Sequence, residues 1–310
     1  MEKFYIFIIN PKAGNGRGEK VWEKVKRNLQ EQNIPYRSFF TQRPGHGKDI
    51  AQQMAHIHHE HMKGIVTVGG DGTMHEVING LSHHPAIPVS FISAGSGNDF
   101  ARGFKIPRAT AQALLHITSK KSRIRRFDIG EYRLRKRKHK PSFFTSSLGI
   151  GFDGEVARRT NESKYKGILN KIGMGSLSYI ITVMKLAMTY QPFQLKIKVD
   201  GKEHEFSDVW LIATTNIKYY GGGMKISPDA IPNDGLLNVC IVHNLSRRKL
   251  LILFGTVFLG LHTKLKEVTL LVGKEIEVDT NRPATMHADG ELIGSTPVNI
   301  KIHSKRLLVK

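Results

Sequence analysis

Over residues 1–128, short apolar runs alternate with stretches that have helical periodicity. Val21, Val25 and Leu29, for example, fall on one face of a predicted helix. We expect strands at 4–9, 35–41, 64–68 and 88–94, helices at 17–32 and 48–61, and a third helix that reaches Leu81. This alternation predicts a parallel sheet with helices on both faces, the doubly wound α/β class.

The pattern changes after residue 128. Alternating residues surround Asp200-Gly201, a dipeptide typical of a tight hairpin. Further strands are expected at 208–216, 235–242, 267–273, 274–279, 285–291 and 298–303, with helical stretches at 163–189 and 246–261. We therefore predict an α/β domain at 1–128 and a mostly antiparallel β-sandwich domain at 129–302, with a tight cleft between them. Residues 303–310 are expected to be able to pack back on the first domain.

Three glycine-rich segments each follow a predicted strand: Asn10–Gly18, Gly69–Thr73 and Gly95–Asp99. Glycine lets backbone N–H groups converge on phosphate oxygens, and a helix that begins just afterwards adds its positive end. None of the three matches the Walker A spacing or the dinucleotide-binding G-x-G-x-x-G fingerprint. Each alone reads as a turn, but three at the carboxyl ends of strands in one domain predict a phosphate-rich ligand.

Four carboxylates lie close to glycines in the sequence. Asp71 and Asp99 lie within the glycine-rich segments, and Asp289 and Glu291 lie between two predicted strands of the second domain. Phosphoryl transfer needs alignment, a metal ion that screens phosphate charge and a base near the attacking hydroxyl. Carboxylates can hold the metal ion and can act as the base. Taken alone, Asp289-Gly290 is equally typical of a plain hairpin turn.

The chain resembles the diacylglycerol kinase catalytic family in four motifs that occur in the family's order. They are NPKAG at 10–14, VTVGGDGTMHEVINGL at 66–81, ISAGSGNDFARGF at 92–104 and HADGE at 287–291. The similarity runs through nearly the whole chain and is strongest to soluble bacterial lipid kinases, with sphingosine kinases more distant. GGDGT alone is less specific, because NAD kinases and phosphofructokinases carry similar strings.

The resemblance implies a nucleotide-binding α/β domain, a β-rich domain for the lipid and ATP between them. The γ-phosphate would pass to the hydroxyl of diacylglycerol or a similar membrane lipid, a step of phospholipid biosynthesis. Residues implied to contact the nucleotide are Asn10, Pro11, Lys12, Ala13, Gly14, Thr41, Gly70, Asp71, Gly72, Thr73, Met74, His75, Glu76 and Ser96. Asp289 would be the base, alone or with Glu291. The charged network around catalytic Mg²⁺ would comprise Asp71, Asp99, Arg102, Asp128, Asp289 and Glu291.

The segment AIPNDGLL at 230–237 resembles the family's structural metal loop. Its implied ligands are Asp234 and the carbonyls of Ile231 and Leu236, an oxygen set suited to Mg²⁺. The chain departs from the family twice. Ile231 stands where certain relatives have an aspartate, and Asn15 stands where some have a lysine. Arg17 or Lys12 would then supply the positive charge.

The chain is strongly basic, with 47 Lys and Arg against 26 Asp and Glu and a net charge of +21. Such an excess indicates a polyanionic partner. We expect the basic segment Arg133–Lys140 to form a hairpin tip, with Phe143 and Phe144 near it, that touches an anionic membrane. The single cysteine, Cys240, is expected in a buried strand of a cytoplasmic protein that is peripheral to the inner face of the membrane.

Two other functions stay open at this stage: a soluble-metabolite kinase of the NAD kinase type, and a nucleotide- or nucleic-acid-binding protein without catalysis. Asp289 and Glu291 argue against the second, and no nucleic-acid recognition motif is present. His58 and His61 would share a face of the helix at 48–61, but a solvated face is favoured over a zinc site. The acceptor lipid is not identified, and a homodimer is one option for the oligomeric state.

Overall fold

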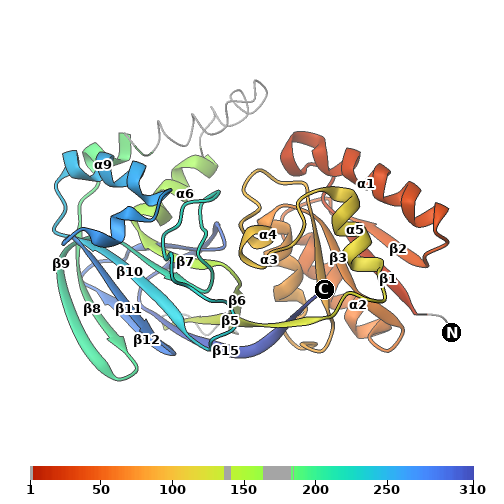
Figure 1. Cartoon of the computed structure of the whole chain (residues 1–310). Coiled ribbons are helices and arrows are strands. Elements are labelled where there is room, and N and C mark those ends of the chain that lie inside the picture. The colour runs from red at the N-terminus through yellow and green to blue at the C-terminus, as the bar shows by residue number, and fades with distance from the viewer. Residues whose placement is uncertain (1–2, 136–140, 163–182, 184) are drawn as a thin grey trace. The chain divides into compact units, whose positions relative to one another are not determined.

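The computed structural model describes residues 3–135, 141–162, 183 and 185–310, and the chain forms two compact units (Figure 1). The first unit runs to Ile129 and includes Ser304–Lys310, and the second comprises Gly130–His303. The division lies one residue beyond the boundary predicted at 128. Most of the helical stretch predicted at 163–189 lies outside the described residues, as does the tip of the predicted basic hairpin at 136–140.

A parallel sheet in the order β15–β4–β3–β1–β2 is the base of the first unit. Its strands are β1 (Phe4–Ile9), β2 (Tyr36–Phe40), β3 (Met62–Gly69), β4 (Val89–Ser93) and the end of β15 (Val298–Val309), where Val309 lies opposite Val89. The central strands are buried almost throughout. Burial on both faces explains why these segments are continuously apolar rather than alternating.

The helices of the first unit cover both faces of this sheet. They are α1 (Ala13–Glu31), α2 (His46–His58), α3 (Asp71–Gly80), α4 (Asp99–Gly103) and α5 (Thr110–Thr118). Trp22 of α1 and Leu114 of α5 share one core with Phe7 of β1. Because side chains alternate along a strand, the neighbours of Phe7 point to the opposite face, where α2 contacts β1 and α3 contacts β3. The doubly wound prediction is confirmed.

Two helices of the first unit test the predicted bounds. Regular helical geometry in α1 begins at residue 17, as predicted, because Gly14, Asn15 and Gly16 have left-handed backbone angles that separate it from the first turn at Ala13. Helix α2 ends at His58, so the predicted shared helical face of His58 and His61 is wrong. Among the residues that the structure describes, no group of three His, Cys, Asp or Glu side chains could hold a metal ion.

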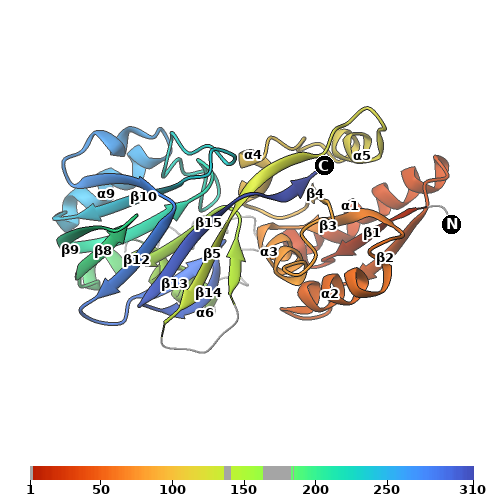
Figure 2. The same ribbon diagram turned by 90° about the horizontal axis from the view of Figure 1, so that it is seen from below.

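The second unit is mostly antiparallel, as predicted, and Figure 2 shows its strands from below. The order β14–β13–β7–β9–β8–β12–β15 has two branches: β10 pairs with β9 and β11 with β10, and β5 pairs with β15 and β6 with β5. The strands are β5 (Arg125–Leu134), β6 (Ser142–Phe144), β7 (Ser147–Gly151), β8 (Phe193–Val199), β9 (Lys202–Thr215), β10 (Leu237–His243), β11 (Val268–Gly273), β12 (Glu275–Thr280), β13 (Thr285–Ala288) and β14 (Glu291–Ser295).

Two hydrophobic cores stabilise the second unit. One lies inside the β-sandwich and includes Phe144, Ile150 and Val278. The other lies beneath α6 (Phe152–Glu162) and α9 (Arg247–Val257), and includes Trp210 and Cys240. Cys240 is fully buried, as predicted, and burial raises the pKa of its thiol to about 12. It is therefore a packing residue rather than a nucleophile.

The hairpin at Asp200-Gly201 is confirmed, since both residues have left-handed angles between β8 and β9. The strand predicted at 208–216 does not begin at 208. It is the second half of β9, which runs from Lys202 to Thr215. Helix α6 was not expected. The helical stretch predicted at 246–261 is α9 followed by a turn and the short helix η1 (Leu261–Lys264). No helix in the described part of the chain is long and apolar enough to cross a membrane.

Candidate active site

The three glycine-rich segments converge in the first unit. A side chain at Gly95 would place its Cβ 2.6 Å from the Cα of Gly70, and one at Gly14 would place its Cβ 2.2 Å from the carbonyl oxygen of Ala94. Real Cβ atoms do not approach backbone this closely, so Gly95 and Gly14 are required by contact between segments. The close approach leaves backbone N–H groups without covering side chains, which is the arrangement that binds phosphate.

Asn10 joins the first of these segments to the second. Its Nδ2 donates to Oγ1 of Thr73 over 3.1 Å, and its Oδ1 accepts from the backbone N–H of Lys12. Thr73 belongs to the first turn of α3, whose N-terminal end carries the positive end of the helix dipole. The structure thus brings Asn10, Gly14, Gly70 and Thr73 together, four of the residues implied to contact a nucleotide.

A buried oxygen beside the glycines has no hydrogen-bond donor among the described residues. It is Oδ1 of Asn98, and the Cβ of a residue at position 95 would lie 3.4 Å from it. Nδ2 of the same side chain donates to the Gly95 carbonyl. Buried polar atoms are almost always paired, so this oxygen fits a ligand that brings a donor. The residues present are therefore compatible with a nucleotide phosphate and its ribose or adenine.

Asp71, Asp99 and Arg102 also come together. The two carboxylate oxygens of Asp71 accept from the backbone N–H groups of Asp99 and Phe100, at 3.2 and 3.0 Å, and so cap α4. Asp99, which is buried, forms an ion pair with Arg102 at 2.7 Å. Asp128 is fully buried in another contact, in which its Oδ1 accepts from the N–H of Lys305 over 2.7 Å.

Glu76 caps helix α2. Its oxygens accept from the N–H groups of Gly45 and Gly47, at 2.7 and 2.8 Å. This carboxylate is therefore engaged inside the protein. Two of the other implied nucleotide contacts have partners inside the protein: the N–H of Thr41 donates to the carbonyl oxygen of Ile9, and His75 lies beside Asn79. The rest differ in exposure. Met74 is buried, Pro11, Ala13 and Gly72 are half-buried, and Lys12 and Ser96 are exposed.

In the second unit Asp289 occupies the turn between β13 and β14, with a left-handed φ of 51°. Its carboxylate accepts from the N–H groups of Thr145, Ser146 and Ser147 at 2.9, 2.8 and 3.2 Å, and from the Thr145 hydroxyl at 3.3 Å. The segment is a hairpin turn, as its sequence alone suggests. In addition, these hydrogen bonds hold the Asp289 carboxylate in one orientation. Glu291 begins β14 and is exposed. The predicted continuous strand at 285–291 is wrong, because it breaks at Asp289.

His287 and Asp153 form a buried pair beneath this turn that the sequence patterns did not predict. Nε2 of His287 lies 3.2 Å from Oδ2 of Asp153, and Nδ1 of His287 accepts from the N–H of Gly290 over 3.2 Å. The hydroxyl of Tyr220 donates to the same Asp153 oxygen, and its ring stacks on His287. The pattern fixes a neutral imidazole with its proton on Nε2. No local sequence pattern connects Asp153 with His287, although the H-A-D-G-E motif does contain His287.

The chain matches two family descriptions. Residues 5–132 match the diacylglycerol kinase catalytic domain, and residues 146–309 match the YegS C-terminal NAD kinase beta sandwich-like domain. The chain is 34% identical over 307 residues to "Putative lipid kinase YtlR" of Bacillus subtilis (strain 168), with 99% of each chain covered. The chain belongs to the diacylglycerol kinase family. It is a kinase.

Other members of the diacylglycerol kinase family are more distant. A "Diacylglycerol kinase" of Mycobacterium tuberculosis (strain ATCC 25618 / H37Rv) is 27% identical over 293 residues, with 94% of this chain and 90% of that protein covered. A crystal structure described as "a putative diacylglycerol kinase from Bacillus anthracis str. Sterne" superimposes with a TM-score of 0.79 at 23% identity. That match covers 99% of this chain and 94% of the other, and it shows the same fold.

The predicted structural metal loop, residues 230–237, contains one carboxylate. Oδ1 of Asp234 accepts from the N–H of Leu236 over 3.0 Å, and the Ile231 side chain is exposed. With no second acidic ligand within the predicted set, the loop fits Mg²⁺ poorly. The charged groups of the first unit, Asp71 and Asp99, offer the donor type that Mg²⁺ prefers.

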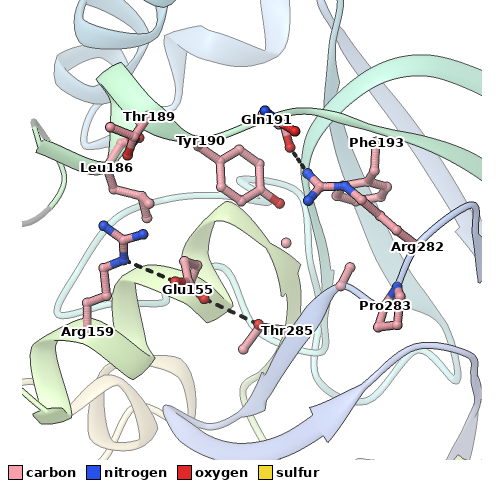
Figure 3. A pocket seen from close by; sticks show the side chains of 12 residues that line it. Glu155, Arg159, Leu186, Thr189, Tyr190, Gln191, Phe193, Arg282, Pro283 and Thr285 are labelled. Carbon is pink, nitrogen blue, oxygen red and sulfur yellow. Dashed lines mark hydrogen bonds and ion pairs between the residues drawn. The ribbon is translucent and has the colours of Figure 1, made fainter.

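The second unit contains a polar cavity of 320 Å³ (Figure 3). Arg159, Glu155 and Thr285 lie on one side of it, and Tyr190 and Arg282 lie on the other. Glu155 accepts from Arg158, Arg159 and Thr285. The hydrogen bond from Arg158, followed by that from Arg159, outweighs burial and holds the pKa of Glu155 below its ordinary value. Burial raises the pKa of Tyr190, so its hydroxyl stays protonated and can donate.

Proposed function

We propose that the protein transfers the γ-phosphate of ATP to the hydroxyl of diacylglycerol or a similar membrane lipid. The observation that carries the lipid acceptor is an apolar cavity that meets the buried Asp153–His287 pair. It lies beneath α6 and α9 and is lined by Phe152, Val156, Val183, Leu211, Met224, Ile226, Val242, Leu250 and Val257, together with Asp153 and Tyr220.

The lining is almost entirely hydrocarbon, apart from Asp153 and the Tyr220 hydroxyl that donates to it. Such a surface favours an acyl chain over a soluble metabolite such as NAD. The cavity measures 40 Å³, which is room for only a few water molecules, since one water needs roughly 10–15 Å³ of cavity volume. Its walls must therefore move apart to admit a chain.

Each unit supplies a part of the proposed reaction. Asn10, Thr73 and the N–H groups around Gly70 and Gly95 would hold the phosphates of ATP. Asp289 would accept the proton of the lipid hydroxyl, because its carboxylate is held by three backbone N–H groups in one orientation. Mg²⁺ would be held by Asp71 and Asp99 and would screen the phosphate charge. Asp71 and Arg102 hold Asp99 and the start of α4 in place.

The reaction is tested with labelled ATP, Mg²⁺ and a panel of lipids in mixed micelles, with NAD as the soluble acceptor. The Asp289→Asn variant should lose about 10²- to 10⁴-fold in rate, the usual range for removal of a general base. Asp200→Asn is a matched control. Asp200 also has a left-handed φ before a glycine, and its Oδ1 accepts from the N–H groups of Lys274 and Glu275.

The Asp200→Asn control distinguishes loss of the catalytic base from disruption of a hairpin turn. Both variants should lose similar stability, but Asp200→Asn should keep its rate. Phosphorylation of NAD in place of every lipid would overturn the proposed acceptor. Equal loss of rate in the two variants would overturn the role of Asp289 as base.

A further inference from the structure

Four large apolar side chains are exposed within eight residues after helix α9. Phe258, Leu259, Leu261 and Leu265 are 46%, 69%, 46% and 37% exposed, and we call them the apolar tip. The tip runs from the residue that follows α9 through the helix η1, in the part of the chain that Figure 1 colours blue. A protein surface rarely gathers so many large apolar groups in one short segment unless the segment binds something.

The tip is held by buried neighbours in the sequence. Val257 and His262 are 4% and 0% exposed, and Nε2 of His262 lies 3.0 Å from the carbonyl oxygen of Ile226. Backbone hydrogen bonds close the turn from Gly260 to Val257 and from Leu265 to His262. The exposed leucines therefore project from an ordered turn whose inward-facing positions are already filled, so they cannot fold back into the core.

The charge around the tip has one sign. Residues 247–266 contain five Lys and Arg and no acidic residue. Lys264 and Lys266 flank Leu265 and are exposed. The next acidic residue, Glu267, is buried and forms an ion pair with Lys249 at 2.7 Å. The tip thus presents hydrocarbon with positive charge beside it and no compensating negative charge on the same segment.

This combination fits an anionic bilayer surface. Phe and Leu side chains enter the boundary between headgroups and acyl chains, while lysines reach the headgroup phosphates. Nucleic acid would use the lysines but leave the leucines in water. The aromatic residues of the predicted basic hairpin do not serve this purpose, because Phe143 and Phe144 are 4% and 0% exposed. The predicted contact of that hairpin with a membrane stays a prediction, because its positions 136–140 lie outside the described residues.

We infer that the apolar tip, with Lys264 and Lys266, docks the protein on an anionic membrane. This surface deepens the proposed function, because a kinase for membrane lipids must reach its acceptor at the bilayer. The partner is a lipid bilayer that carries phosphatidylglycerol or a similar anionic lipid.

The test is co-sedimentation of the full chain with vesicles of phosphatidylcholine, with and without phosphatidylglycerol. The Leu259→Ser/Leu261→Ser variant should lose binding by about tenfold for each leucine. The Lys264→Ser/Lys266→Ser variant should lose about fivefold for each lysine at low salt, and only with anionic vesicles. Ile57→Ser is the matched control, since Ile57 on α2 is 52% exposed but residues 49–62 around it contain Asp49 and Glu60 and no lysine or arginine. It should bind as the unmodified protein does.

Unchanged vesicle binding in the leucine variant, or an equal loss in Ile57→Ser, would overturn the inference. A drop in molecular mass of the lipid-free protein on the leucine substitutions would also overturn it, since the tip would then join two copies of the chain. Circular dichroism checks that each variant is folded.

A second assay separates this inference from the proposed function. Phosphorylation of a short-chain diacylglycerol, dispersed without vesicles, should be unchanged in the leucine variant. If the unmodified protein phosphorylates no lipid but binds anionic vesicles through the tip, the proposed function fails and the docking surface stands. If it phosphorylates the short-chain lipid and the leucine variant still binds vesicles fully, the docking surface fails and the function stands.

Discussion

His287 and Asp153 are 134 positions apart in the sequence, yet Nε2 of His287 lies 3.2 Å from Oδ2 of Asp153. Through its other ring nitrogen His287 also accepts from Gly290, the residue after Asp289. Helix α6 therefore fixes the turn that carries the proposed base. Asp153 and His287 are positioning residues in this arrangement, because they act through the turn.

Replacement of His287 by alanine should lower kcat by about a hundredfold, because small displacements of a catalytic group carry such costs. The KM for ATP should stay unchanged, since the glycine-rich segments lie in the first unit. Steady-state kinetics with varied ATP measure both values. His243→Ala is the control, because His243 on β10 pairs with Thr269 instead. A rise in KM for ATP without a change in kcat would contradict the positioning role.

The glycine contacts predict a graded effect on nucleotide binding. Gly95→Ala should weaken ATP binding more than Gly70→Ala, because the new Cβ atoms would lie 2.6 and 3.3 Å from the facing Cα. We expect at least a tenfold rise in Kd for Gly95→Ala, measured by calorimetry, from the shift that the clash imposes on the segments. Gly255→Ala should have no effect, since nothing lies within 4 Å of its Cβ. Equal affinity in Gly95→Ala would show that ATP binds elsewhere.

Glu76 should prove to be a structural residue. Because its two oxygens cap α2, Glu76→Gln should lower the free energy of unfolding by about 1–2 kcal/mol. The KM for ATP should rise less than tenfold. Denaturant unfolding and kinetics on the same samples decide the matter. A large rise in KM at unchanged stability would instead assign Glu76 to the nucleotide, as the family resemblance implies.

Glu131 should make stability depend on pH. Burial raises its pKa, but hydrogen bonds from Arg133 and His303 and the charge of Lys301 outweigh burial and leave the pKa below its ordinary 4.5. A carboxylate with a depressed pKa stabilises the folded state above its unfolded pKa, and this stabilisation is lost as pH falls through the folded pKa.

Glu131→Gln should therefore cost about 1–3 kcal/mol at pH 7, because Arg133 and His303 lose a charged acceptor that is itself buried. The difference from the unmodified protein should shrink as pH falls below about 4.5. Thermal unfolding across pH measures this difference. Glu277→Gln, at an exposed position on β12, should change stability little at any pH. A constant difference for Glu131→Gln down to pH 2 would contradict the assigned linkage.

The first unit could be predicted almost entirely from local pattern. Each strand from Phe4–Ile9 to Val89–Ser93 is a short, mainly apolar run, and glycines follow the carboxyl ends of β1, β3 and β4. The hairpin at Asp200-Gly201 was equally local. Such features were found because a few neighbouring residues determine them.

Features that depend on distant contacts were missed. Helix α6 has few apolar residues, and Phe152 and Val156 do not make a helical stripe that stands out from the strand before them. The burial of Phe143 and Phe144 likewise follows from packing, which their basic neighbours in the sequence conceal. The contact between Asp153 and His287 depends on β13 lying beside β7, a pairing that no local pattern encodes.

The first unit is not contiguous in sequence, because Ser304–Lys310 belongs to it. Val309 pairs with Val89, and the N–H of Lys305 satisfies the buried carboxylate of Asp128. During synthesis on the ribosome, the nascent chain therefore cannot complete its N-terminal unit until its last residues emerge. The first unit is thus begun before the second and completed after it, so the second unit is made while the first still has an open sheet edge.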